Sequence, residues 1–174
     1  MDDLRYPIGK FSYTAGSTEE RRRLWIDEIA KTPDRLREAV AGMSDDQLDT
    51  PYRPEGWTVR QVIHHLPDSH LNSYTRFRLA LTEDNPLIKP YYEDRWANLP
   101  DARTSPVECS LDLLDGLHRR WVLLLNSLAG ADLKRKFQHP ELGEVTLEKN
   151  LALYAWHGRH HVAHITALKE RKGW

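Results

Sequence analysis

The sequence lacks several features that would assign it to a common class of protein. Its single cysteine, Cys109, excludes an internal disulfide and a cysteine-rich zinc site. Its apolar runs, such as the one from Trp121 to Leu125, are far shorter than the roughly 20 residues that a transmembrane helix needs. No basic segment followed by an apolar one opens the chain, so we expect no secretory signal peptide. We therefore expect a cytoplasmic protein with no membrane partner.

The sequence also has no excess of positive charge. Its 25 Lys and Arg residues nearly balance 26 Asp and Glu residues, which leaves a formal net charge of −1. Proteins that bind nucleic acid usually carry a basic face. The short run from Arg21 to Arg23 is typical of a solvated helix face. We therefore expect no nucleic-acid partner.

Several catalytic signatures are missing as well. The absence of His-Glu-x-x-His excludes the usual zincin site, and the absence of Glu-x-x-His excludes a di-iron carboxylate bundle. There is no Gly-x-Ser-x-Gly motif and no glycine-rich phosphate loop. The sequence identifies no general base, so catalytic residues beyond a metal site stay unknown at this point.

Four long segments have a helical pattern, and each begins with a helix start signal. They run from Ser17 to about Met43 with a restart at Thr32-Pro33, from Thr58 to about Leu81, from Ser105 to about Leu128, and from Thr146 to about Lys172. In the first three a Ser or Thr is followed three residues later by Glu or Gln, which is the pattern of a capping box. We therefore predict an all-α protein, an antiparallel four-helix bundle in which residues 1–174 form a single domain.

Two connections between these helices are unusual. The segment from Thr82 to Thr104 is rich in proline and aromatic residues, and a connection of that length in a compact domain is often a lid or a crossover with its own short helix. The segment from Lys136 to Val145 contains a proline and a glycine, which predicts either a small hairpin or an irregular loop.

Histidines are the feature that the sequence has in excess. Seven of the nine lie in two short stretches: His64, His65 and His70, then His157, His160, His161 and His164. The second stretch contains two nested His-x-x-x-His pairs. Residues four apart on a helix lie on one face, about 5–6 Å apart, which is close enough to bind one ion. Such pairs are also common as packed or surface residues, but a second cluster on another helix can supply the third ligand that a metal site needs.

Helical phase distinguishes between the two nested pairs. At about 100° per residue, the apolar stripe of the last helix is formed by Leu147, Leu151, Tyr154, Val162 and Ile165. His161 falls within this stripe and His157 on its flank, whereas His160 and His164 fall toward the outer side. Phase therefore favours His157 and His161. Gly158 lies near the centre of the stripe, where it either permits a close approach or leaves a space.

Phase on the first cluster leaves two alternatives open. The inner stripe of that helix is formed by Val59, Val62, Ile63, Leu66 and Phe77. His70 then falls near its centre, His65 on a flank and His64 outside. Pro67 removes one backbone hydrogen bond beside His65 and can kink the helix. The third ligand by this reasoning is either His65 or His70.

Two segments carry a resemblance to a known family. The stretch from Gly56 to His70 resembles the first metal motif of the DinB-like superfamily, and the stretch from Trp156 to Ile165 resembles its second. The similarity is closest to the YfiT branch of metal-dependent hydrolases and runs from Tyr6 to Trp174. It implies a four-helix bundle with a long connection between helices 2 and 3, a cytoplasmic homodimer, and one divalent ion per subunit, Zn²⁺ or Ni²⁺.

The resemblance also implies which histidines are ligands. In the family the first ligand immediately precedes the Leu of a His-Leu-x-Asp-Ser motif, which corresponds to His65, and the others correspond to His157 and His161. Pro67 stands where the family more often has a small residue. On the His65 face, phase also places Ser69, Asn72 and Arg76, and the last of these can hold an anionic group.

Three functions are compatible with such a site. Three histidines leave at least one position on the ion for water or substrate, so a metal-dependent hydrolase of a small molecule is the preferred interpretation. The first alternative is a metal-dependent thiol S-transferase of the bacillithiol type, which acts on electrophiles. The second is a non-catalytic bundle in which the ion only ties helices together.

Overall fold

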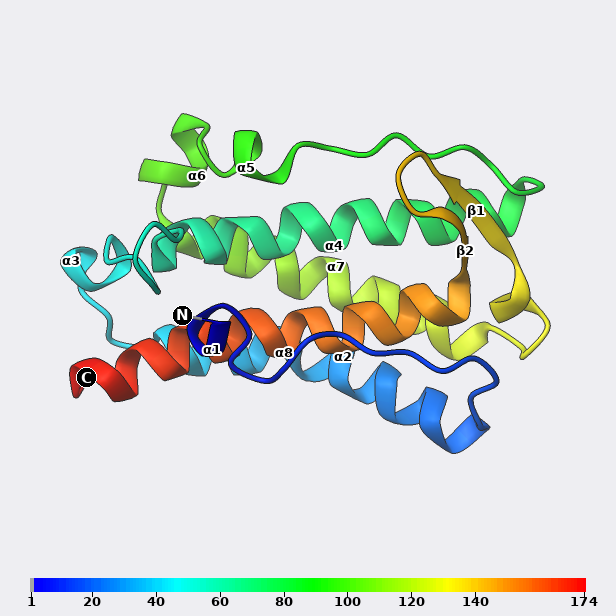
Figure 1. The fold of residues 1–174 in the computed structure, drawn as a ribbon, viewed down its shortest axis with the longest axis horizontal. Coiled ribbons are helices and arrows are strands. Elements are labelled where there is room, and N and C mark those ends of the chain that lie inside the picture. Colours follow the sequence, from blue (N-terminus) through cyan, green and yellow to red (C-terminus); the bar gives the residue numbers. More distant parts are fainter. Residues whose placement is uncertain (1) are drawn as a thin grey trace.

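The structure is a computed structural model that describes residues 2–174, and four long helices dominate it (Figure 1). They are α2 (Glu19–Val40), α4 (Val59–Thr82), α7 (Val107–Ser127) and α8 (Leu147–Lys172). The shorter elements are α1 (Asp2–Arg5), α3 (Asp45–Leu48), α5 (Glu93–Trp96), α6 (Pro100–Thr104), the 3₁₀ turn η1 (Asp132–Lys134), and the strands β1 (Lys136–His139) and β2 (Gly143–Thr146). The predicted four-helix bundle is confirmed. No helix within residues 2–174 combines the length and apolarity that crossing a bilayer requires.

The order of helix directions differs from an antiparallel bundle. In Figure 1, α2 and α8 run from right to left, whereas α4 and α7 both run from left to right. This is possible because residues 83–106, with α5 and α6, return along the bundle so that α7 begins at the same end as α4. The long connection is therefore a crossover with short helices of its own, as the sequence predicted. As a consequence, the antiparallel prediction is wrong for two pairs, α4 with α7 and α2 with α8, which run parallel.

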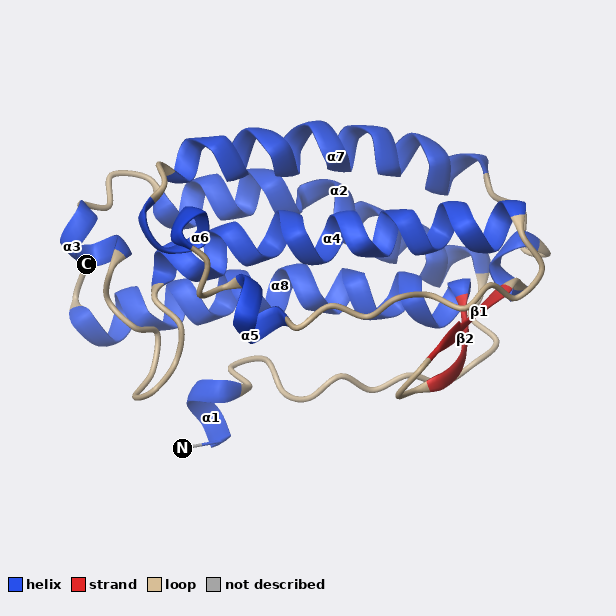
Figure 2. Ribbon diagram, turned by 90° about the horizontal axis from the view of Figure 1, so that it is seen from above, coloured by secondary structure: helices blue, strands red, loops and turns tan. Residues whose placement is uncertain are grey.

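The segment between η1 and α8 forms the hairpin that was one of the two predictions. Strand β1 pairs antiparallel with β2, with Phe137 opposite Val145. The hairpin lies at one end of the bundle, beside the start of the crossover (Figure 2). Gln138 forms two backbone hydrogen bonds there, donating to Pro86 and accepting from Ile88. The hairpin thus anchors the crossover at the end from which it departs.

Two of the predicted helix starts are confirmed. At α4, the Thr58 hydroxyl accepts from the Gln61 amide N–H at 3.2 Å, and the Gln61 side chain accepts from the Thr58 N–H at 2.9 Å. This reciprocal pair is the predicted capping box. At α8, Thr146 caps the Lys149 amide at 3.2 Å, and Gly173 ends the helix with a φ of 70°. Both helices that carry the candidate ligands therefore begin where the sequence predicted.

The other two caps are wrong. Helix α2 is capped by Thr18, because the Ser17 hydroxyl instead donates to the Glu148 carboxylate at 2.5 Å. Helix α7 has Pro106 at its N-cap and no side-chain cap, so Ser105 does not close a capping box. The Ser17 hydroxyl, which resembles a local cap in the sequence, is bound here by another part of the fold.

Helix α2 is continuous through Pro33, although the sequence predicted a restart there. A proline within a helix cannot donate its backbone N–H to the carbonyl four residues earlier, here that of Ile29. One residue before the proline, Thr32 contacts α8 at Gly158, where a Cβ atom would lie only 2.5 Å from the Thr32 hydroxyl. The close approach that the glycine suggested is therefore confirmed, and it brings α2 and α8 together as parallel neighbours.

The interior consists of two apolar clusters with a polar layer between them. One cluster contains Phe77, Trp121 and Leu151, and the other contains Leu36 and Leu114. Buried histidines from α4, α7 and α8 form this layer. Along their helices, some lie between residues of the two clusters, namely His70, His160, His161 and His164. The others lie among residues of one cluster, namely His64, His65 and His118. Buried polar groups cost free energy unless they are hydrogen-bonded, so this layer is where a functional constraint is expected.

Candidate metal centre

Three histidine side chains from two helices converge in the polar layer. The Nε2 atom of His157 lies 3.4 Å from Nε2 of His65 and 3.2 Å from Nε2 of His161. All three ligand nitrogens lie within 4.8 Å of one another. A tetrahedral zinc ion with Zn–N distances of about 2.0–2.1 Å separates its nitrogen ligands by about 3.3 Å. The two short separations therefore have the spacing that one ion requires.

The arrangement follows from two helices that run in opposite directions. On α8, the four-residue spacing places His157 and His161 on one face, and α4 supplies His65 across from them. Pro67 does not interrupt α4, which is continuous from Val59 to Thr82. Of the two candidates on α4, His65 joins the cluster, whereas His70 lies behind His157, with its Nε2 atom 3.1 Å from Nδ1 of His157. The three side chains that the family resemblance implies are thus together in space.

Burial keeps these imidazoles neutral. Burial, together with the neighbouring His160 and His164, lowers the pKa of His65 to about 3. Burial likewise lowers the pKa values of His157 and His161 well below 6.5. A neutral imidazole offers a lone pair, and a metal ligand must be in this form. The three residues thus fit a divalent ion by chemistry as well as by spacing.

The second histidine pair on α8 does not lie on the exposed outer side of the helix, where helical phase placed it. His160 and His164 are buried, with exposed fractions of 7% and 3%, although the sequence placed them on the outer side. The N-terminal segment covers them: His164 donates from Nε2 to the Arg5 carbonyl at 3.0 Å, and His160 stacks on Tyr6. Tyr52 stacks on His164 from the other side, with a centroid separation of 4.0 Å. The prediction failed because a segment outside the four helices supplies the cover.

His64, predicted to lie outside, is also buried. Its Nδ1 atom lies 2.7 Å from the Ser110 hydroxyl, and its Nε2 atom lies 3.3 Å from the Ser105 carbonyl. Helix α7 and the residues that precede it therefore satisfy both ring nitrogens of His64. This side chain ties α4 to α7 and takes no part in the cluster.

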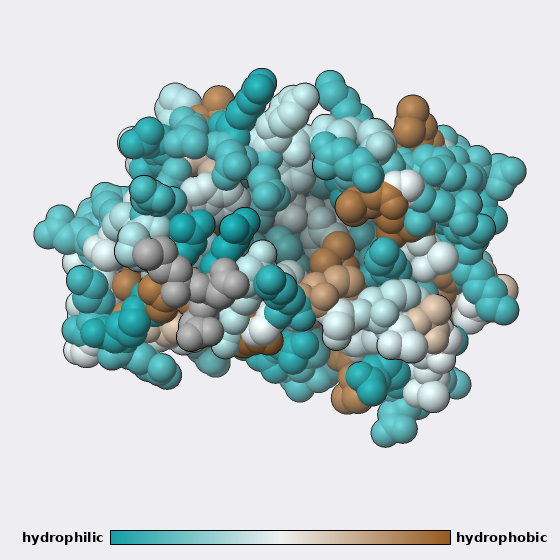
Figure 3. Space-filling view, viewed as in Figure 1, coloured by the Kyte–Doolittle hydropathy of each residue, from teal (hydrophilic) through white to brown (hydrophobic). Residues whose placement is uncertain are grey.

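Two cavities reach the three histidines. The larger, about 720 Å³, has His157 in its lining and extends past Ser69 and Tyr154 to Arg76 and His139. In the view of Figure 3, a hollow near the middle of the molecule interrupts a mostly hydrophilic surface. The smaller cavity, about 460 Å³, is lined by all three histidines of the cluster together with Trp57 and residues of the N-terminal segment. His157 lines both cavities, so the cluster is accessible from two sides.

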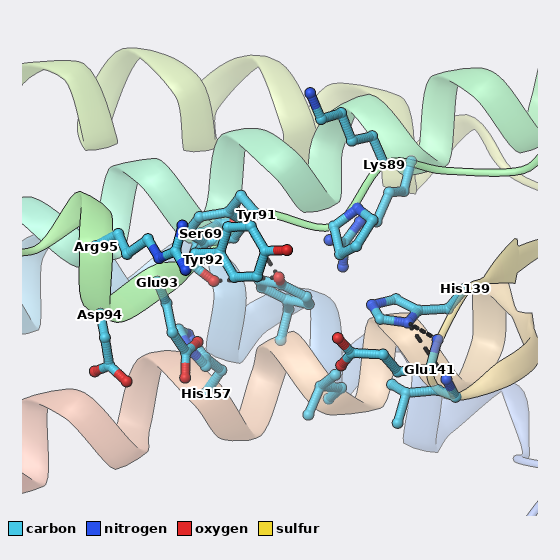
Figure 4. Close-up of a pocket in the computed structure, with 15 residues that line it drawn as sticks. Ser69, Lys89, Tyr91, Tyr92, Glu93, Asp94, Arg95, His139, Glu141 and His157 are labelled. Carbon is cyan, nitrogen blue, oxygen red and sulfur yellow. Dashed lines mark hydrogen bonds between the residues drawn. The ribbon is translucent and has the colours of Figure 1, made fainter.

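One carboxylate that the sequence did not single out is found here. Glu93, the first residue of α5, lines both cavities, and its side chain points toward His157 in Figure 4. Burial raises the pKa of Glu93, and Asp94 and Glu141 raise it further. A carboxylate with a raised pKa is a better proton acceptor. Its position on the crossover, which has no helical periodicity to read, explains why sequence reasoning missed it.

Predicted cavity residues are found in part. Ser69 and Arg76 line the larger cavity, whereas the Asn72 side chain instead donates to the Asp68 carbonyl at 2.9 Å. Within the described chain, Arg76 Nε is buried without a hydrogen-bond partner, and its guanidinium forms no ion pair. The Tyr154 hydroxyl donates to the Ser69 carbonyl at 3.2 Å. The cavity thus holds an unpaired cation.

Comparison with known proteins gives consistent results. A protein of Bacillus mycoides strain KBAB4 is 59% identical over 174 residues, and one of Bacillus cereus strain B4264 is 58% identical, with both chains covered completely in each case. Both relatives are named "putative metal-dependent hydrolase". YfiT from Bacillus subtilis, described as "a probable metal-dependent hydrolase with an unusual four-helix bundle topology", superposes with a TM-score of 0.97 at 50% identity over 99% of each chain.

A more distant structure shows the same fold. The four-helix bundle protein TT2238 superposes with a TM-score of 0.56 at 20% identity, covering 88% of this chain and 99% of the other. The sequence profile of the DinB superfamily matches residues 28–165, a range that contains all three clustered histidines. The chain therefore belongs to the DinB superfamily.

Proposed function

We propose that this protein is a metal-dependent hydrolase of a small molecule, with one divalent ion held by His65, His157 and His161. The observation that carries the proposal is the convergence of three neutral imidazole nitrogens, with separations of 3.2 and 3.4 Å, at the wall of a cavity of about 460 Å³. His157 also lines the larger cavity of about 720 Å³. Cavities of about 300–1,000 Å³ are typical of small-molecule sites. The names of the relatives that are 58–59% identical support the same activity.

The bound ion and the residues around it would have different roles in the reaction. When bound, the ion supplies a Lewis acid and lowers the pKa of a coordinated water toward about 7. Three protein ligands would leave at least one position on the ion for water or substrate. Glu93, which faces His157, would accept the proton of the attacking water, and its raised pKa suits that role.

The end of the larger cavity that lies distant from His157 indicates a class of substrate. The Arg76 guanidinium lines this end without a carboxylate partner in the described chain, and Lys89 lines it too. A charge-assisted hydrogen bond from an arginine to a carboxylate or phosphate is strong and geometrically specific. We therefore expect a substrate with an anionic group at one end and the scissile bond at the other.

The nature of the ion is part of the proposal. An all-imidazole ligand set suits zinc, nickel, copper and iron, and the family resemblance favours Zn²⁺ or Ni²⁺. The same resemblance supports a cytoplasmic location and a homodimer. Sedimentation of the purified protein would test the dimer. Neither nucleic acid nor a membrane is proposed as a partner.

A second function is favoured by the presence of two cavities. Because the cavities of about 720 and 460 Å³ meet at His157, two reactants could approach the ion, one from each cavity. A thiol S-transferase needs such an arrangement, since the ion would hold one reactant as a thiolate while the other, an electrophile, approaches. The structural-ion alternative needs neither cavity.

The deciding experiment uses metal-loaded protein and two sets of substrates. Ester or amide cleavage that requires the ion and no thiol would support hydrolysis. If a thioether forms from bacillithiol and an electrophile, and no ester or amide is cleaved when the thiol is absent, the protein is a thiol S-transferase and not a hydrolase. If chelation lowers the melting temperature strongly but no substrate of either set reacts, the ion is structural and the proposal is wrong.

A further inference from the structure

A chain of hydrogen bonds runs from the candidate metal ligand His157 across the whole bundle. Nδ1 of His157 lies 3.1 Å from Nε2 of His70, and Nδ1 of His70 lies 2.8 Å from Nε2 of His118. Nδ1 of His118 in turn lies 2.7 Å from the backbone carbonyl oxygen of Ile29. One residue comes from each of the four long helices: Ile29 from α2, His70 from α4, His118 from α7 and His157 from α8.

The carbonyl at the end of the chain determines where the protons lie. A carbonyl oxygen only accepts, so His118 must carry its proton on Nδ1. In a neutral imidazole the other nitrogen is then an acceptor, so Nε2 of His118 accepts from Nδ1–H of His70. By the same step, Nε2 of His70 accepts from Nδ1–H of His157. The remaining lone pair of His157 is on Nε2, the atom that faces His65 and His161.

The sequence of α2 makes that carbonyl available. In an uninterrupted helix the Ile29 carbonyl would accept from the N–H of the residue four positions later, but that residue is Pro33, which has no N–H. The proline thus leaves a backbone acceptor inside the bundle, and His118 uses it. This gives a physical reason for a proline in the middle of a 22-residue helix.

This chain of hydrogen bonds is buried and well packed, so the ring protons of its histidines have no competing partners. His70 is fully buried and His118 is 1% exposed. His70 meets the rings of Trp121 and Tyr154 edge to face, with centroid separations of 5.9 and 5.0 Å. Every ring nitrogen of His70 and His118 has a partner, which buried polar groups require.

We propose that His118 and His70 are positioning residues which, together with the Ile29 carbonyl, hold His157 in the Nδ1–H tautomer and so aim its Nε2 lone pair at the metal ion. This inference rests on the proposed metal site for its functional meaning, but the tautomers themselves are a property of the metal-free chain. Hydrogen bonds of this kind behind a metal-binding histidine fix ring orientation and raise ligand basicity.

The first experiment examines the tautomers without any metal. Long-range proton–nitrogen NMR spectra of the ¹⁵N-histidine-labelled apoprotein at pH 7.5 distinguish an Nδ1–H from an Nε2–H ring. We expect His70, His118 and His157 all to carry the proton on Nδ1. An Nε2–H signal for His118 or His70 would overturn the proposal, whatever the protein then does with a metal.

The second experiment measures zinc affinity by competition with a chelator. We expect His118→Phe, which removes both ring nitrogens, to bind Zn²⁺ about 10- to 100-fold more weakly than wild type. His118→Gln keeps an acceptor at the end of the side chain and should recover most of the loss. His64→Phe is the matched control, since His64 is a buried histidine on α4 outside the chain of hydrogen bonds, and its affinity should match wild type.

A third variant addresses the possibility that core substitutions disturb folding. Pro33→Ala restores a backbone N–H that competes for the Ile29 carbonyl and leaves every histidine in place. We expect this variant to stay helical, to show mixed tautomers at His118 and to bind Zn²⁺ several-fold more weakly. Wild-type tautomers and affinity in Pro33→Ala, together with wild-type affinity in folded His118→Phe, would refute the positioning role. If wild type itself binds no Zn²⁺, the proposed metal site fails, while the NMR result still decides the tautomers.

Discussion

The two histidine pairs of α8 share a spacing but have different surroundings. His157 and His161 face α4, and their Nε2 atoms lie 3.2 Å apart. His160 and His164 face the N-terminal segment, where Tyr6 stacks on one ring and the Arg5 carbonyl accepts from the other. Burial does not separate the pairs, because His160 and His161 are 7% and 8% exposed, and only His157 is half-buried. The pairs differ in the direction in which their ring nitrogens point and in the groups that the rings contact.

The comparison teaches that the His-x-x-x-His motif is only a geometric possibility. The inner pair, His157 and His161, has nitrogen lone pairs that converge with that of His65. The outer pair, His160 and His164, is held by aromatic stacking and by a hydrogen bond to a backbone carbonyl. The outer pair therefore anchors the N-terminal segment over the smaller cavity. Four experiments test the roles of these residues and of the neighbouring cavity, in decreasing order of the effect that we expect.

The largest effect is expected for a member of the inner pair, His157 and His161. His161→Ala should weaken Zn²⁺ binding more than about 100-fold, because a direct ligand contributes more than the groups behind it. His160→Ala, one residue away, should change the affinity less than about threefold. Chelator competition on both folded variants provides the measurement. Equal losses in the two variants would mean that the assignment of the pairs is wrong.

The second effect concerns substrate choice at the end of the cavity distant from His157. Arg76→Ala should lower kcat/KM for an anionic ester, mono-p-nitrophenyl glutarate, about 10- to 100-fold, in line with the roughly 1.5–3 kcal/mol of a charged hydrogen bond. It should leave the neutral ester p-nitrophenyl butyrate nearly unaffected. Arg78→Ala is the control, since Arg78 is exposed and lies over the Tyr74 ring. A similar loss with both esters would argue against an anion site.

The third effect is an acid sensitivity of the metal-free protein. Burial lowers the pKa of His118 to about 4, below the value of about 6.5 that it has when unfolded. The unfolded chain therefore binds more protons between these values, so stability is complete above pH 6.5 and falls as the pH drops toward 4. From His118 alone we expect a loss of about 2 kcal/mol between pH 7 and pH 5.

Urea unfolding at several pH values, with EDTA present, measures this dependence. The His118→Phe variant should show a weaker pH dependence, because it has lost one of the buried groups that must take up a proton. His139→Phe is a suitable control, since His139 is only half-buried at the end of β1. An unchanged slope in His118→Phe would show that His118 does not titrate on unfolding.

The smallest effect is expected for the outer pair. His164→Ala removes the hydrogen bond to the Arg5 carbonyl and the stacking with Tyr52. We expect a loss of about 1–3 kcal/mol in the free energy of unfolding and faster proteolysis near the N-terminus, with Zn²⁺ affinity unchanged. A loss of Zn²⁺ affinity without a loss of stability would move His164 into the metal centre.

Much of the fold could be predicted from the sequence because its signals are local. The capping residues Thr58 and Thr146 act within one helical turn, and both were identified correctly. Ser17 and Ser105 have similar local patterns, but Glu148 recruits the first and α7 begins after Pro106 without the second. Directions of the helices were not predictable from such signals, since the course of the crossover decides that α4 and α7 run parallel.

The candidate site was predictable where helical spacing and family motifs coincide. His65, His157 and His161 were identified from the sequence, the first of them only by resemblance, and the fold brings them together. That they bind an ion stays a prediction. Phase failed for His160 and His164, because segments outside the four helices bury them.

By itself, the sequence determined the four helices, the pairing of His157 with His161, and the proline that leaves the Ile29 carbonyl without a helical donor, because each of these depends on covalent chemistry and on spacing within one helix. Only the tertiary structure decided the rest. It brought His65 rather than His70 into the cluster, it aligned His70 and His118 behind His157, and it placed Glu93 beside the site. These relations join residues on different helices and on the crossover, and their distances depend on how those elements pack.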